Sequence, residues 1–177
     1  VQWLEEAYED PKLIFSIDDP KTRKWLNFGG SDTRADIVVV QANGENGLEL
    51  DIIEVKTLSE PDSAFEVQKE DGELIVNGKA VDQLTETTET VRGLFDGEDN
   101  ITTPPRREAL REQLYYELTG ASSDEHTSEW AERVNSVFKG EGQLRVSPRI
   151  VSVEINNGAG SESSQRCLTE DRQEVTV

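Results

Sequence analysis

Two apolar runs in the first third of the chain set the main expectation about its structure. They read DIVVV and LELDII, and the Gly/Asn-rich segment NGENG separates them. Short runs of β-branched and aliphatic residues bounded by turn residues predict β-strands, and a short connection that contains glycine predicts a hairpin. We therefore expect strands at about 35–42 and 47–57, paired antiparallel around Glu45.

The rest of the chain alternates between strand-like and helix-like patterns. Before and after this hairpin we expect a helix over 1–10, a strand over 12–18, and a projecting hairpin over 64–79 that turns at Asp71-Gly72. Three helices follow over 80–95, 105–120 and 123–140, with a Ser123 cap on the last and stops at Gly120 and Gly140. The chain then continues with a strand over 143–156 and a segment over 165–177 that pairs antiparallel with it. This order predicts one α/β domain over residues 1–177, with a central mixed β-sheet flanked by helices on both sides.

Charged residues at the ends of the two apolar strands can be assigned to a face, because side chains alternate along a strand. If the hairpin centres on Glu45, paired residues have numbers that sum to twice 45, and Asp36 lies opposite Glu54. Lys56 follows on the same face as Glu54. The pattern therefore predicts an acid pair and a lysine together at one end of an otherwise apolar face.

Two opposed carboxylates have a chemical consequence. Their Cβ atoms would lie roughly 4.5–5.5 Å apart, so they repel each other unless a cation lies between them. Mg²⁺ takes oxygen ligands and commonly uses one or two carboxylates with phosphate oxygens and water, and Lys56 beside it would polarise water or neutralise charge on phosphorus. The competing interpretation is a structural ion pair. Both faces of the strand are apolar up to Val55, which favours the functional site.

The same residues resemble a known motif. Asp36 on one strand and EVK on the next, residues Glu54, Val55 and Lys56, resemble the PD-(D/E)xK nuclease superfamily, with Ala35 where the family name has proline. The resemblance implies a restriction-endonuclease-like core. It also implies Mg²⁺ or Mn²⁺ held by the two carboxylates and the Val55 carbonyl, and a catalytic lysine at Lys56 that assists the attacking water.

Further site residues follow from the resemblance only as candidates. Some branches of the superfamily carry Gln or Tyr on the helix after the motif, and Gln83 is the best match here. The weaker alternatives are Gln113 with Tyr116 or Glu117 on the next helix, and Glu5, Glu6 or Glu9 on the first helix. Ser31 and Arg34, beside two glycines, are candidates for contacting a substrate phosphate, and Arg34 is about equally suited to pairing with a neighbouring acid.

Composition changes the interpretation of the charge. Asp and Glu number 37 against 18 Lys and Arg, the formal net charge is −19, and methionine is absent. This resembles the composition of haloarchaeal proteins, in which molar salt screens self-repulsion, so the charge then says little about the partner. At ordinary ionic strength the same charge would argue against nucleic acid. The nearest match to a phosphate-binding patch is the cluster of Arg106, Arg107 and Arg111 at a helix start, where pairing with Glu108 and Glu112 is slightly favoured over phosphate binding.

Several other classes of protein are disfavoured. Cys167 and His126 are each the only residue of their type, so no disulfide framework or Cys/His zinc site can form within one chain. No run is long and apolar enough to span a membrane, and we expect a cytoplasmic protein. The start at VQWLEE suggests a piece of a longer protein.

The sequence therefore predicts a Mg²⁺- or Mn²⁺-dependent DNA endonuclease domain of a restriction, defence or repair system. Its partners would be DNA and other domains or subunits of such a complex, and a homodimer is possible. The main alternative is a catalytically inactive module of the same fold that binds DNA or other proteins. A weaker alternative is an acidic DNA mimic, which would need its acids on one continuous face.

Overall fold

The computed structural model of the 177-residue chain describes seven stretches of it. They are residues 12–20, 34–58, 65–96, 104–121, 127–154, 166–169 and 173–177. The elements are β1 (Lys12–Ser16), β2 (Ile37–Asn43), β3 (Gly47–Leu58), β4 (Glu66–Glu70), β5 (Glu73–Asn77), α3 (Lys79–Asp96), α4 (Pro104–Ala121), α5 (Thr127–Lys139), β6 (Leu144–Glu154), β7 (Arg166–Leu168) and β8 (Glu174–Thr176). The helix expected over 1–10 and the cap at Ser123 lie outside the described residues.

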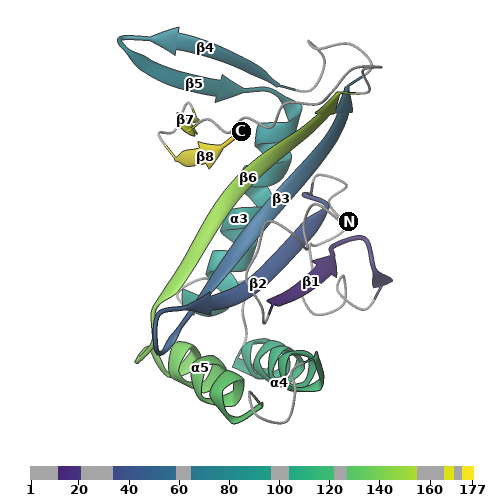
Figure 1. The fold of residues 1–177 in the computed structure, drawn as a ribbon, viewed down its shortest axis with the longest axis vertical. Helices are drawn as coiled ribbons and strands as arrows, with labels where there is room; N and C mark the ends of the chain where they lie inside the picture. Colours follow the sequence, from purple (N-terminus) through teal and green to yellow (C-terminus); the bar gives the residue numbers. More distant parts are fainter. Residues whose placement is uncertain are drawn as a thin grey trace.

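The strands form one mixed sheet in the order β1-β2-β3-β6-β8-β7-β5-β4. β1, β2 and β3 pair antiparallel in succession, and β6 then pairs parallel with β3. Figure 1 shows α3 running along β3 and β6, while α4 and α5 lie together at the end of the sheet that carries the β2–β3 turn. The α/β class with a mixed sheet is therefore confirmed.

Alternation along β2 and β3 divides their apolar side chains between two clusters. Val38, Val40, Leu50 and Ile52 join the main core, to which all three described helices contribute. A smaller cluster on the opposite face contains Val39 and Ile53. The described helices thus cover the face that the sequence pattern assigned to Glu54, and helices on both faces stay a prediction.

The register of the β2–β3 hairpin agrees with the sequence-based prediction. Val40 pairs with Leu50 and Val38 with Ile52, so the paired residue numbers sum to twice 45. The buried side chain of Arg133 on α5 donates a hydrogen bond to the carbonyl of Gly44 and fixes the turn against this helix. A one-residue slip would exchange the two faces, so this turn determines which side chains meet α3.

Gly47 offers a test of that register. A Cβ added there would lie 2.4 Å from the carbonyl oxygen of Asn43 and 2.8 Å from that of Gln143, and both are backbone atoms that cannot move easily. We expect Gly47→Ala to lower the free energy of unfolding by about 1–3 kcal/mol, as measured by urea unfolding. Gly44→Asn is the control, because nothing lies within 4 Å of the added Cβ and asparagine tolerates the positive φ of 64°. Equal stability of the two variants would contradict the packing of this turn.

Of four further expectations, two are confirmed and two are wrong. The β4–β5 hairpin turns at Asp71 and Gly72, both at positive φ, and α5 ends at Lys139 with Gly140 at φ 75°. Gly120 does not stop its helix, because α4 continues to Ala121. The final segment is not an antiparallel partner of β6: β8 pairs parallel with β6, and β7 pairs antiparallel with β8.

No described helix is long and apolar enough to cross a membrane.

Candidate functional site

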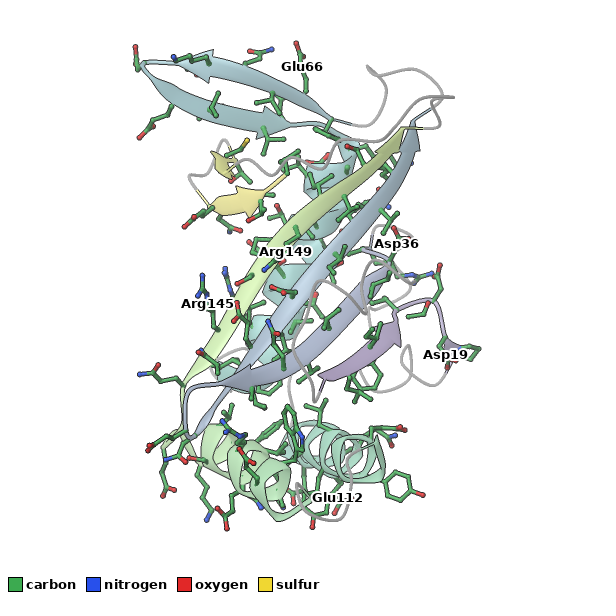
Figure 2. All side chains as sticks on the ribbon, in the orientation of Figure 1. Asp19, Asp36, Glu66, Glu112, Arg145 and Arg149 are labelled. Atoms are coloured by element: carbon green, nitrogen blue, oxygen red, sulfur yellow. The ribbon has the colours of Figure 1, made fainter. Side chains whose placement is uncertain are left out.

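Asp36 lies directly before β2 and ends the β2–β3 ladder with its side chain. The last ladder pair is Ile37 with Ile53. The Asp36 amide donates to the carbonyl of Ile53 at 3.1 Å, and its Oδ2 accepts the amide of Val55 at 2.8 Å. Aspartate competes well for backbone amides in this way. The expectation of an Asp36–Glu54 ladder pair is therefore wrong, although the Asp36 carboxylate still reaches the Glu54–Lys56 segment of β3 (Figure 2).

Glu54 is an acid inside the core. Its side chain is 1% exposed, on the face of β3 that packs against α3. One carboxylate oxygen, Oε1, forms an ion pair with Lys56, whose side chain is 26% exposed. The other, Oε2, has no hydrogen-bond partner among the described residues. A buried carboxylate oxygen without a partner costs free energy, and a bound ion, a water molecule or a catalytic role can account for it.

The electrostatics of Glu54 reflect this setting. Burial raises the pKa of its carboxyl group above the ordinary value of 4.5, and the hydrogen bond from Lys56 opposes that rise. The negative charges of Asp36 and Asp18 raise the pKa further. Two acids thus act on a third across the end of the sheet, and a bound cation would relieve this repulsion.

This pKa predicts a pH dependence of stability. As the pH rises from 4.5, the unfolded chain loses the Glu54 proton before the folded protein does, so the contribution of this residue to stability falls until the raised pKa is passed. In urea unfolding without metal, we expect the stability of the unaltered protein relative to Glu54→Gln to decrease over this interval and then level off. A difference that does not depend on pH, or that grows in favour of the unaltered protein, would contradict this account.

Gln83 on α3 connects Lys56 to the segment before Asp36. Lys56 Nζ donates to Gln83 Oε1 at 3.1 Å, and Gln83 Nε2 donates to the carbonyl of Arg34 at 3.3 Å. The lysine amine is thereby held between the Glu54 carboxylate and the amide of a helix residue. Of the candidates for a residue on a following helix, Gln83 is the one that contacts Lys56.

Two residues near the site carried no signal in the sequence analysis. Thr87, one turn after Gln83, is fully buried and accepts the amide of Ala35 at 2.8 Å. Asp18 follows β1 and forms an ion pair with Arg34 at 3.4 Å. The spacing of four residues places Thr87 on the same helix face as Gln83, but that position is also typical of an ordinary core residue. Nothing in the sequence connects Asp18 with Arg34.

The remaining candidates lie elsewhere or outside the described residues. Arg34 pairs with an acid, as one of its two interpretations held, and Ser31 is not described. Gln113 bonds to Glu117 within α4 at 2.6 Å, and Tyr116 is 72% exposed on the same helix. Arg111 pairs with Glu108, which agrees with the favoured interpretation of that arginine cluster. The glutamates at positions 5, 6 and 9 and the side chains at 106 and 107 are not described.

Asp51 faces away from the site, as alternation predicts. It is fully buried and lies 3.2 Å from the Nε of Arg149 on β6. Glu49 lies on the same face of β3, and its Oε1 is 3.4 Å from the Nε of Arg145 on β6. Figure 2 shows both arginines along β6, so these acids pair across the β3–β6 ladder and not with Glu54.

The donor set suits a hard divalent cation in part. Asp36 and Glu54 carry carboxylate oxygens, and Glu54 Oε2 lacks a partner in the described part of the chain. The role of the Val55 carbonyl as a ligand stays a prediction. In the same part of the chain, no three His, Cys, Asp or Glu side chains group closely enough to form a metal cage on their own. An ion here would rely on water or substrate oxygens for its remaining ligands, as Mg²⁺ commonly does.

Comparison with known proteins adds no relationship to this geometry. No family model, curated protein or solved structure matches the chain.

Proposed function

We propose that the protein is a metal-dependent phosphodiesterase that cleaves DNA, with its site at the end of the β2–β3 hairpin. The observation that carries the proposal is the Glu54 carboxylate, buried to 1% exposure with one oxygen that has no hydrogen-bond partner in the described residues. Asp36 and Lys56 lie beside it. The resemblance of Asp36 and Glu54-Val55-Lys56 to the PD-(D/E)xK superfamily supports the same assignment.

The residues would divide the work by their chemistry. Asp36, Glu54 and the Val55 carbonyl would hold Mg²⁺ or Mn²⁺, which when bound supplies a Lewis acid for the scissile phosphate. Lys56 carries the positive charge, and its ion pair with Glu54 and hydrogen bond from Nζ to Gln83 hold that charge close to the acids. From there it can orient a water molecule and stabilise the negative charge that develops on phosphorus.

The partly exposed side of the site would admit the substrate. Asp36 and Val55 are half-buried, and Lys56 is 26% exposed, so the site lies at the border between core and solvent. The core around the buried Glu54 provides a surrounding of low dielectric, and the exposed side of the site admits a phosphate. The net charge of −19 would repel DNA at low ionic strength, so we place the working conditions at molar salt, as the haloarchaeal composition suggests.

The proposal is tested by incubating the unaltered protein with labelled single- and double-stranded DNA at molar salt. Mg²⁺ or Mn²⁺ should produce cleavage fragments, and chelation with EDTA should stop the reaction. DNA binding or partner binding without cleavage at any metal concentration would favour the alternative, an inactive module of nuclease-like fold. Cleavage that EDTA leaves unchanged would contradict the assigned site.

A further inference from the structure

We infer that Thr87 is a positioning residue for the proposed site and that it acts by fixing the chain segment that presents Asp36. The inference rests on the proposed function. The evidence is a pair of consecutive hydrogen bonds that joins residue 35 to α3, which we call the Thr87 bridge. It consists of the Ala35 amide, the Thr87 hydroxyl and the Gln83 carbonyl.

The Thr87 bridge has a defined direction. Thr87 Oγ1 donates its proton to the carbonyl of Gln83, one turn earlier in α3, at 2.8 Å. The lone pairs of the same oxygen then face the Ala35 amide, which donates to it at 2.8 Å across 52 residues of sequence. A threonine hydroxyl in a helix commonly donates to the preceding turn, but here its acceptor capacity is used by a distant segment.

Both ends of the bridge are buried. Thr87 is 0% exposed and Ala35 is 1% exposed, so water cannot replace either partner at low cost. A buried amide without an acceptor is expensive, and the chain would shift to satisfy it. Since Asp36 is the next residue, any such shift would move the carboxylate away from the Val55 amide and from Glu54.

The identity of residue 35 makes this contact possible. Proline, which the superfamily name has at this position, carries no amide hydrogen and cannot donate to a hydroxyl. With alanine, the segment has an amide to satisfy, and Thr87 supplies the acceptor. The same glutamine also provides a second anchor for this segment. The side-chain amide of Gln83 donates to the carbonyl of Arg34, while the backbone carbonyl of Gln83 accepts the hydrogen bond from Thr87.

The neighbouring residue Thr88 provides a matched control. It is also fully buried on α3, but its Oγ1 has no hydrogen-bond partner among the described residues. Valine has nearly the same shape as threonine without the hydroxyl. Thr87→Val therefore removes the bridge, Thr88→Val removes a buried hydroxyl of no assigned role, and Thr87→Ser keeps the hydroxyl while removing a methyl group.

The experiment is a Mn²⁺ titration of the full chain at molar salt for these three variants and the unaltered protein, with urea unfolding of the metal-free forms. We expect Thr87→Val to weaken Mn²⁺ binding about tenfold or more, as loss of partners that orient metal ligands commonly does. Thr87→Ser should bind within about threefold of the unaltered protein, and Thr88→Val should bind equally well.

The outcomes separate this inference from the proposed function. If the unaltered protein binds no Mn²⁺, the proposed function fails together with the inference. If it binds and Thr87→Val binds equally well, the inference alone is overturned. Equal weakening by Thr87→Val and Thr88→Val would also overturn it, because the effect would then follow general loss of packing. If Thr87→Val does not fold, Thr87→Ser decides the question. Loss of Mn²⁺ binding by Thr87→Ser would then count against the bridge, and retained Mn²⁺ binding would support it.

Discussion

Replacing Glu54 by glutamine is expected to reduce metal-dependent DNA cleavage by at least about a hundredfold. Glutamine keeps the shape of the side chain but loses the charge that would bind the cation, and even residues that merely orient metal ligands are worth about 10–100-fold. The measurement is the initial rate of DNA cleavage at saturating Mg²⁺ and molar salt. Glu66→Gln is the control, since Glu66 is exposed on the projecting β4–β5 hairpin and away from Asp36 (Figure 2).

The stability of the same variant separates a metal site from a structural ion pair. Burial raises the pKa of Glu54, so its charge works against folding at neutral pH when no metal is present. We therefore expect metal-free Glu54→Gln to be at least as stable as the unaltered protein. A structural ion pair predicts the reverse, because its removal would destabilise the core. A clear loss of stability with unchanged cleavage would contradict the functional assignment.

Replacing Lys56 by methionine is expected to lower the rate of cleavage by about 10²–10³-fold while Mn²⁺ binding is retained. Methionine preserves the apolar stem of the side chain and removes the charge that Glu54 and Gln83 hold in place. The two readouts are single-turnover cleavage and Mn²⁺ titration. They distinguish this variant from Glu54→Gln, for which both should be lost.

Lys69→Met is the matched control for the lysine. Lys69 is exposed on β4, so its replacement changes the net charge equally without touching the site. Lys56→Arg adds a second comparison, since arginine keeps the charge but its planar fork differs from a compact ammonium group. Cleavage by Lys56→Met at the rate of Lys69→Met would exclude a catalytic lysine at this position.

The sequence predicted most reliably what depends on local pattern. The apolar alternation of 36–40 and 48–53, together with the central Glu45, determined the hairpin register and the face on which Glu54 lies. These features follow from the period of two along a strand, and a slip would have exposed the apolar face. Helices α3 and α5 followed from the periodicity of their apolar residues in the same way, whereas α4 has little such periodicity.

Other features depend on contacts that local pattern does not encode. The ladder stops at Ile37 because the Asp36 side chain takes the Val55 amide, a competition between side chain and backbone that alternation cannot reveal. The parallel pairing of β8 with β6 depends on the path of the chain between them, which composition left open. Thr87 has the helix position of an ordinary core residue, and only its contact with Ala35 distinguishes it.

The central claim is that Asp36, Glu54 and the Val55 carbonyl form a divalent-cation site. The most direct test is a calorimetric titration of Mn²⁺ into the unaltered protein and into Glu54→Gln at about 1 M salt, where a Debye length of roughly 3 Å suppresses diffuse binding to the acidic surface. The account predicts one saturable binding event for the unaltered protein and its loss in Glu54→Gln. Identical titrations of the two proteins, or no binding by either, would contradict it.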